Sequence, residues 1–170
     1  SVIAADGWRE DDVLRIAASL DQGAEHPLAQ AIVAEARQRG LPLAAPESFE
    51  TAGGIGVRGG VAGKRVAIGN TALMQDDAID WRPVEQAAEA LRVKGASVMF
   101  VAVDGTIAGL LAVSDPIKPT TAAALAALRA DGIRVVMATG DGWSTARAVG
   151  ATLGIDEVIG EVKPQDKVDL

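Results

Sequence analysis

The dipeptide Asp104-Gly105 separates two apolar runs, 98–103 and 106–113, and it limits the possible folds more than any other feature of this chain. A favoured two-residue hairpin turn needs positive φ at both central residues, a conformation that Asp-Gly adopts readily. The first run, Val-Met-Phe-Val-Ala-Val, is rich in the β-branched and aromatic residues that favour strands. The sequence therefore predicts a β-hairpin here, within an antiparallel sheet.

Helical patterns and short strands precede this hairpin. Acidic residues 10–12 are typical of the first turn of a helix, where they meet the positive end of its dipole. Pro27 suits the first position of a second helix, which we expect to end at Gly40. Glycine-punctuated, β-branched residues over 49–70 predict short strands, and an apolar stripe predicts a further helix over 83–94.

The pattern changes at Ser114-Asp115-Pro116, which we interpret as a domain boundary. Beyond it the chain alternates between helix and strand, with helices expected over 120–130 and 144–153 and strands over 133–138 and 157–159. Such alternation is typical of parallel βα units. We therefore expect an α+β domain over 1–113, with an antiparallel sheet flanked by helices, and a partial α/β domain over 114–170.

Composition excludes several classes of protein. Apolar residues make up 49% of the chain, which is enough for a packed core rather than a disordered tail. The net charge is −7 and the basic residues are scattered, which argues against a nucleic-acid-binding surface. A chain without Cys has no disulfide framework, Cys-based zinc site or thiolate nucleophile. No apolar run reaches the roughly 20 residues that span a bilayer, and a start without Met leads us to expect a piece of a longer protein.

Five short motifs together carry a family resemblance. They are the histidine-containing run 21–28, the glycine-rich run 54–59, Gly69-Asn70, Thr139-Gly140-Asp141, and the Lys-Pro-Gln-Asp-Lys run 163–167. In this order they resemble the heavy-metal-transporting P-type ATPases, the first three matching the nucleotide-binding domain and the last two the haloacid-dehalogenase-like phosphorylation domain. The resemblance covers nearly the whole chain. The phosphorylated Asp-Lys-Thr-Gly-Thr motif of that family is not among these 170 residues.

The resemblance assigns a nucleotide-binding role to the residues around the single histidine. His26 is expected to pack against the adenine base, whereas composition alone favours a helix-capping or surface histidine. Asp21 stands where the family usually has Glu, which hydrogen-bonds the adenine amino group. Asp is one methylene shorter than Glu, which leaves three ways to reach the adenine amino group. The helix that carries Asp21 lies closer to the base, or a water molecule bridges Asp21 and the base, or Glu25 takes part of this role.

Gly54, Gly56 and Asn70 complete the expected nucleotide site. The spacing Gly-x-Gly-x-x-Gly matches a dinucleotide fingerprint, but strand-like residues follow it where that fingerprint needs a helix. Two explanations of the glycines remain: a glycine-rich hairpin or bulge, or a ligand lying against the backbone where a Cβ would collide. The resemblance favours the second for Gly54 and Gly56. Asn70 is either a helix cap in an ordinary turn or, in addition, a neighbour of the ribose or adenine edge.

A second group of residues is expected to support phosphoryl transfer in the parent pump. Thr139, Gly140 and Asp141 follow an apolar strand, at the strand end where open α/β sheets bind ligands. The resemblance adds Lys167 as a neutralising ammonium. Where the family usually has Asn after the Asp, this chain has Gly142, so a side-chain contact from that position is in doubt.

The resemblance implies a cytosolic, ATP-binding piece of a membrane pump that exports metal ions, with Mg²⁺ as a cofactor of the parent enzyme. The partners would be ATP or ADP and the remaining phosphorylation, actuator and transmembrane domains, with no nucleic acid. Copper is preferred on overall likeness, and the isolated piece is expected to be inactive. A stand-alone dehalogenase-like phosphatase is the alternative, opposed by Ala102 at the nucleophile position before Asp104-Gly105-Thr106. A non-catalytic interaction module is the other.

Overall fold

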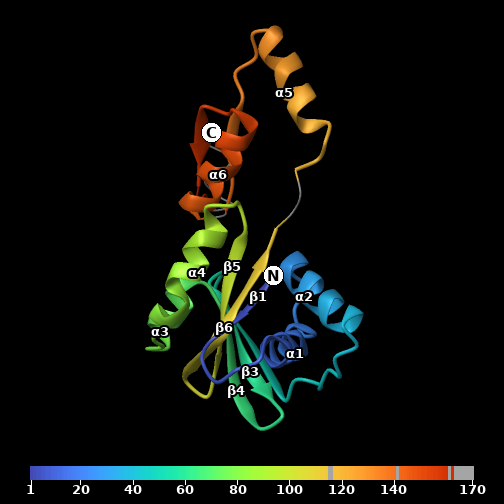
Figure 1. Ribbon diagram of the computed structural model, residues 1–170, viewed down its shortest axis with the longest axis vertical. Helices are drawn as coiled ribbons and strands as arrows, with labels where there is room; N and C mark the ends of the chain where they lie inside the picture. The colour runs from blue at the N-terminus through green and yellow to red at the C-terminus, as the bar shows by residue number, and fades with distance from the viewer. Residues whose placement is uncertain (115–116, 141, 161, 163–170) are drawn as a thin grey trace. The chain divides into compact units, whose positions relative to one another are not determined.

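A computed structural model describes residues 1–114, 117–140, 142–160 and 162 (Figure 1). The chain divides into two compact units. Unit 1 consists of residues 1–88 and 98–113, and unit 2 of residues 89–97 and 114–170.

Unit 1 is built on a six-stranded sheet in the order β1-β6-β5-β4-β3-β2. Its strands are β1 (Val2–Ala4), β2 (Ser48–Ala52), β3 (Gly56–Val61), β4 (Lys64–Gly69), β5 (Ser97–Val103) and β6 (Thr106–Val113). The pairs β1–β6, β2–β3, β3–β4 and β4–β5 are antiparallel. This arrangement confirms the predicted antiparallel sheet.

Two pairs of helices cover the sheet (Figure 1). The helices α1 (Glu10–Asp21) and α2 (Pro27–Gln38) lie on one side, and α3 (Thr71–Asp76) and α4 (Arg82–Arg92) lie on the other. The buried stripe of α1 packs with Val101 and Val103 of the sheet, whereas the alternating Phe100 and Ala102 are equally buried. A strand buried on both faces reads as a continuous apolar run, which explains the unbroken hydrophobicity of residues 98–103.

The hairpin turn at Asp104-Gly105 has the predicted geometry. Asp104 has φ of 51° and Gly105 has φ of 83°, so both central residues lie in the left-handed region that the favoured two-residue turns require. A second such turn joins β3 to β4, with φ of 51° at Ala62 and 73° at Gly63. This turn is harder to recognise from the sequence because Ala seldom adopts positive φ.

Unit 2 contains α5 (Thr121–Ala130), β7 (Val136–Ala138), α6 (Trp143–Leu153) and β8 (Glu157–Ile159). β7 and β8 pair in parallel, from Val136 opposite Glu157 to Ala138 opposite Ile159. Helix α6 packs closely on β8, since a Cβ at Gly150 would overlap the Val158 side chain. The alternation of helix and strand confirms the predicted α/β character, although β7 is shorter than the expected 133–138.

The strand β1 was not predicted, and the helix α3 was implied only by the possible helix cap at Asn70. The strand β1 is three residues long and the helix α3 is six, and both are shorter than the window over which periodicity becomes readable. Of the helices that the structure describes, none combines the length and apolar character needed to cross a membrane. The fold class predicted from the sequence, an α+β domain followed by a partial α/β domain, is confirmed.

Candidate functional site

The side chain of Asp21 is buried at the end of α1. The residue is only 5% exposed, yet no hydrogen bond or ion pair to its carboxyl is found among the described residues. Since no described side-chain oxygen is both fully buried and unpaired, the carboxyl oxygens still reach solvent. Burial raises the pKa of the Asp21 carboxyl to about 7, because a low-dielectric surrounding disfavours the charged form.

His26 is the N-cap of α2, five residues after Asp21. Its Nδ1 accepts a hydrogen bond from the backbone N–H of Leu28 at 3.2 Å, and Pro27 begins the helix. With Nδ1 as acceptor, the neutral ring carries its proton on Nε2. His26 and Glu25 are both exposed, so the imidazole face is open to a ligand. The structure thus shows the helix-capping role that composition favours for His26. The exposed face of its ring is not used by this cap.

The glycine turn, which we define as residues 53–55, joins β2 to β3. Gly54 has φ of +82° and open space around the position of a Cβ. Gly56 differs, since a Cβ there would lie 2.6 Å from the Cα of Gly69 and 2.7 Å from Leu73 Cδ2. The close approach of the chain to itself is therefore sufficient to require glycine at position 56, whereas the surroundings of Gly54 leave room for a ligand.

Asn70 connects the glycine turn to α3. Its Oδ1 accepts from the Leu73 N–H at 3.2 Å, which caps the helix, and its own N–H donates to the carbonyl of Ile55 at 2.9 Å. The structure therefore brings together Asn70 and the turn that contains Gly54. Asn70 caps a helix, as both interpretations of Gly69-Asn70 expected, and its proximity to a nucleotide stays a prediction.

The end of α1 packs on β2 and β3, the two strands that the glycine turn joins. A Cβ at Gly23 would lie 2.9 Å from Phe49 Cδ2 on β2, and one at Gly59 on β3 would overlap Leu20. Asp21 lies between these two contact points in the sequence. Asp21, Glu25 and His26 all lie at the junction of α1 and α2, and no hydrogen bond among the described residues joins their side chains to the glycine turn.

An ion-pair cluster on the other face of β3 was missed from the sequence. The Arg58 guanidinium donates from Nε and Nη2 to Asp77 at 2.7 to 3.0 Å, and from Nη2 to Asp76 at 2.5 Å. These hydrogen bonds raise the pKa of the Arg58 guanidinium. The only signal in the sequence is a lone Arg among glycines and an acidic pair at the end of a short helix.

Thr139 and Gly140 lie at the carboxyl end of β7, as predicted. The Thr139 N–H donates to Ile159 O at 2.9 Å and the Thr139 carbonyl accepts from the Val162 N–H at 3.0 Å. Gly142 is the N-cap of α6 and provides no side-chain cap. Asp141 and Lys167, the other two residues expected at this phosphoryl site, lie outside the residues that the structure describes.

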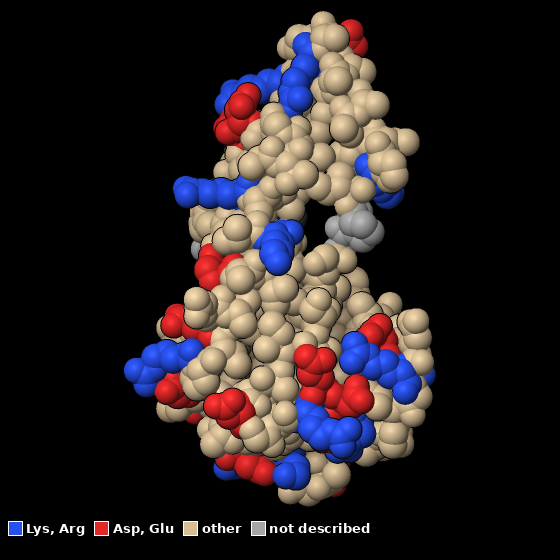
Figure 2. Space-filling view, viewed as in Figure 1, with Lys and Arg blue, Asp and Glu red and all other residues tan. Residues whose placement is uncertain are grey.

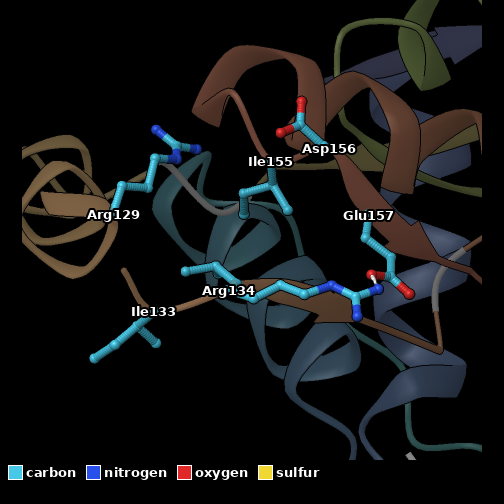
Figure 3. Close-up of a pocket in the computed structure, with 7 residues that line it drawn as sticks. Arg129, Ile133, Arg134, Ile155, Asp156 and Glu157 are labelled. Atoms are coloured by element: carbon cyan, nitrogen blue, oxygen red, sulfur yellow. Dashed lines mark hydrogen bonds and ion pairs between the residues drawn. The ribbon is translucent and has the colours of Figure 1, made fainter. Parts of the chain in front are cut away.

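A pocket of about 440 Å³ in unit 2 lies at the other end of this small sheet (Figure 3). Ile133 and Arg134 precede β7, and Asp156 precedes β8, so the pocket is at the amino ends of the two parallel strands. Arg134 crosses it to pair with Glu157. Because open α/β sheets bind ligands at the carboxyl ends of their strands, this pocket is separate from the Thr139 site.

Charged side chains mark no extended basic surface on the face shown in Figure 2, where Lys and Arg alternate with Asp and Glu. Among the described residues, no three His, Cys, Asp or Glu side chains are grouped so that they could hold a metal ion. The described residues therefore include no cluster of side chains that could hold Mg²⁺ without further ligands such as phosphate oxygens or water.

Asp104 serves the hairpin and not a nucleophile site. Its Oδ1 accepts from the Arg65 N–H at 2.9 Å, and Lys64 Nζ lies 3.9 Å from Oδ2. Ala102, which occupies the position of a dehalogenase nucleophile two residues earlier, is 1% exposed within β5. The Asp-Gly-Thr run 104–106 therefore forms a hairpin turn and not the nucleophile motif of a dehalogenase-like phosphatase.

The chain is similar to one known protein family and to several metal-transporting ATPases. The model of the haloacid dehalogenase-like hydrolase family matches residues 3–170. The chain is 52% identical over 161 residues to the copper-transporting P-type ATPase of Rhizobium leguminosarum bv. viciae, covering 95% of this chain and 19% of that protein. It is 45% identical over 166 residues to the silver exporting P-type ATPase of Salmonella typhimurium, covering 98% and 20%. The chain thus spans about a fifth of the length of these curated relatives.

Solved structures agree with these relatives. A zinc-transporting PIB-type ATPase in its E2·Pi state matches with a TM-score of 0.71 and 32% identity, covering 99% of this chain and 27% of that one. The N-domain of a copper-transporting P-type ATPase matches with a TM-score of 0.56 and 31% identity, covering 67% of this chain and 97% of that one.

Proposed function

Because this chain belongs to the haloacid dehalogenase-like hydrolases, and within them to the heavy-metal-transporting P-type ATPases, we propose that it is the ATP-binding cytosolic segment of such a pump. Residues 1–113 form the nucleotide-binding domain, and residues 114–170 contribute part of the phosphorylation domain. The remaining phosphorylation, actuator and transmembrane domains of the parent pump are the partners. The proposed cargo is copper, exported across the membrane that the pump spans, since relatives named for copper share 52% and 50% identity with the chain.

The observation that carries this proposal is the buried, unpartnered carboxyl of Asp21. Burial shields this carboxyl from most of the water that would hydrate it, so a ligand that brings a hydrogen-bond donor to its solvent-facing oxygens would stabilise the side chain. The exocyclic amino group of adenine is such a donor, and it projects from a planar ring whose two faces are largely apolar. We therefore assign recognition of the base to Asp21, although it is one methylene shorter than the Glu that the family resemblance leads us to expect there.

His26 and the glycine turn supply the remaining contacts. The exposed imidazole of His26 offers a flat face on which a base stacks, while its Nδ1 stays bound to the α2 backbone. Gly54 allows a ligand to approach the backbone because no Cβ projects there. Asn70, which is bound to Ile55, lies near the ribose or adenine edge, and Glu25 contributes an exposed carboxylate beside the base.

The phosphates of ATP extend away from this base site toward an aspartate outside these 170 residues. Phosphoryl transfer depends mainly on positioning and charge neutralisation. In the parent pump the Thr139 hydroxyl and the Gly140 amide would contact the transferred phosphoryl group, with Asp141 and Lys167 completing that site. Mg²⁺, which the parent enzyme uses with ATP, would be held by groups other than the described residues.

Nucleotide titration of the 170-residue chain tests the proposal. Calorimetry should give dissociation constants for ATP between tens of micromolar and millimolar, where the millimolar end corresponds to about 4 kcal/mol of binding free energy. ATP, ADP and AMP should bind within about tenfold of one another, a spread of roughly 1.4 kcal/mol, because no Lys or Arg lies in the base site. GTP should bind more weakly, since guanine presents a carbonyl where adenine presents an amino donor.

Two variants and one control sharpen this test. Asp21→Asn and His26→Gln should weaken ATP binding and leave the fold intact. Asp80→Asn, which removes an exposed ion pair with Arg82, should bind ATP like the parent chain. Equal affinities for GTP and ATP would contradict the assigned pocket, and no binding at millimolar ATP would favour the non-catalytic interaction module.

A further inference from the structure

We infer that Arg58 is a positioning residue for the nucleotide site, holding the glycine turn in place by binding the far end of helix α3. This inference rests on the proposed function, because it assigns a purpose to the rigidity of the turn that the nucleotide would contact. Arg58 itself contacts Asp76, the last residue of α3, and Asp77, which follows it.

The strand β3 needs such an attachment. Its sequence is Gly-Val-Arg-Gly-Gly-Val, and glycine in a strand interior loses more conformational entropy than other residues and provides no side chain to pack. Of the three residues in β3 with substantial side chains, Val57 and Val61 face α1 as part of its apolar cluster. Arg58 is the one that reaches α3.

The hydrogen bonds of Arg58 hold its side chain in one orientation relative to the end of α3. The guanidinium makes three hydrogen bonds to Asp77 at 2.7, 2.9 and 3.0 Å and one to Asp76 at 2.5 Å. The Arg58 and Asp77 side chains are 28% and 24% exposed, so the pair is partly shielded from water. A planar guanidinium that binds a carboxylate through two nitrogens restricts orientation as well as distance.

Helix α3 is attached to β3 at both of its ends. At its start, the Asn70 N–H donates to Ile55 O, and at its end Asp77 binds Arg58. Three residues of strand from Ile55 to Arg58 span about 10 Å, and seven residues of helix from Asn70 to Asp77 also span about 10 Å. Because the two lengths match, α3 can lie along the first half of β3 with both of its ends attached. This attachment fixes the position of Asn70, whose N–H binds the carbonyl of Ile55 in the glycine turn.

The same geometry excludes Arg58 as a phosphate ligand in this conformation. Residues of a strand alternate between faces, and a Cβ at Gly59 would point at Leu20 of α1, the helix that carries Asp21. Arg58 therefore projects from the opposite face, toward α3. Its charge is already neutralised by two carboxylates.

The test compares three variants of the 170-residue chain by calorimetry with ATP and by NMR without nucleotide. Arg58→Gln should raise the dissociation constant for ATP about tenfold and broaden the amide signals of residues 53–55. Arg58→Lys should give an intermediate result, because it keeps the charge and loses the planar fork. Val2→Ala is the control, since it truncates a buried side chain in β1, at the other edge of the sheet from β2 and β3, and should leave both readouts unchanged.

Each other outcome overturns the inference or part of it. ATP affinity within twofold of the parent chain in folded Arg58→Gln would overturn it, as would an equal loss of affinity in Val2→Ala, which would indicate a general effect of stability. If Arg58→Gln does not fold, unchanged affinity in Arg58→Lys and Asp77→Asn would do the same. If the parent chain binds no ATP, the proposed function fails, and sharp amide signals for the turn in Arg58→Gln would separately overturn the role of Arg58.

Discussion

The backbone N–H of Asn70 donates to the carbonyl of Ile55 at 2.9 Å, so the residue that caps α3 also closes the glycine turn. One short helix thereby links two local features that are separate in the sequence. The arrangement makes the cap at Asn70 relevant both to stability and to the conformation of the candidate nucleotide site.

Replacement of Asn70 by Ala should lower the free energy of unfolding by about 1 kcal/mol, because the Leu73 N–H loses its side-chain acceptor. Asn70→Asp and Asn70→Ser should retain most of the stability, since both keep a capping oxygen. Urea denaturation of the three variants measures this order. Identical midpoints for the Ala and Asp variants would show that the cap contributes nothing.

Asp21 should make the stability of the chain fall as pH rises between about 4 and 7. Its pKa is raised by burial from 3.8 to about 7, so the folded state retains a proton that the unfolded state has lost in this window, and the contribution is fully present only below the unfolded pKa. Integrated over about three pKa units, the effect is at most about 4 kcal/mol. The difference in unfolding free energy between the parent chain and Asp21→Asn, measured by urea denaturation from pH 4 to pH 8, should therefore change in favour of the variant. A difference that is constant with pH would show an ordinary, solvated carboxyl.

Gly54 and Gly56 should respond differently to substitution by Ala. At Gly56 the added Cβ would collide with the backbone of Gly69, and we expect a loss of about 3 kcal/mol or more in stability. At Gly54 the space is open and only the positive φ opposes a side chain, which costs about 1 to 2 kcal/mol. Thermal unfolding and ATP calorimetry together should show Gly54→Ala folded but weaker in ATP binding. A folded Gly54→Ala with unchanged affinity would remove this turn from the nucleotide site.

Local signals predicted much of the fold. The hairpin turn at Asp104-Gly105 and the helix start at Pro27 each depend on the conformation of one or two residues, so a short piece of sequence is sufficient to indicate them. The sequence also placed Thr139 correctly at the end of a strand, because an apolar run that ends in a polar residue is readable without knowledge of the rest of the sheet.

The interactions that organise the candidate site are long-range and were not predictable in the same way. Arg58 and Asp77 are 19 residues apart and meet only because α3 folds back along β3. The requirement for glycine at position 56 arises from its register with Gly69 in β4, which depends on the turn at Ala62-Gly63. A glycine-rich pattern therefore indicated the region of the site but could not distinguish a glycine needed by the fold from one available to a ligand.

The 170-residue chain should form no acid-stable phosphoenzyme and show no ATPase or phosphatase activity. Phosphoryl transfer of this kind needs an aspartate nucleophile, a magnesium site and neutralising groups in one place. The sequence contains no Asp-Lys-Thr-Gly-Thr motif, and the described residues contain no group of three potential metal ligands. Asp104 is committed to its hairpin by the Arg65 N–H, while Thr139 and Gly140 supply a hydroxyl and an amide without a nucleophile. Incubation with γ-labelled ATP, acid quenching and gel electrophoresis should give no labelled band. A band that hydroxylamine removes would reveal an acyl phosphate on this chain, and it would mean that the chain itself accepts the phosphoryl group that we propose it delivers to an aspartate elsewhere in the pump.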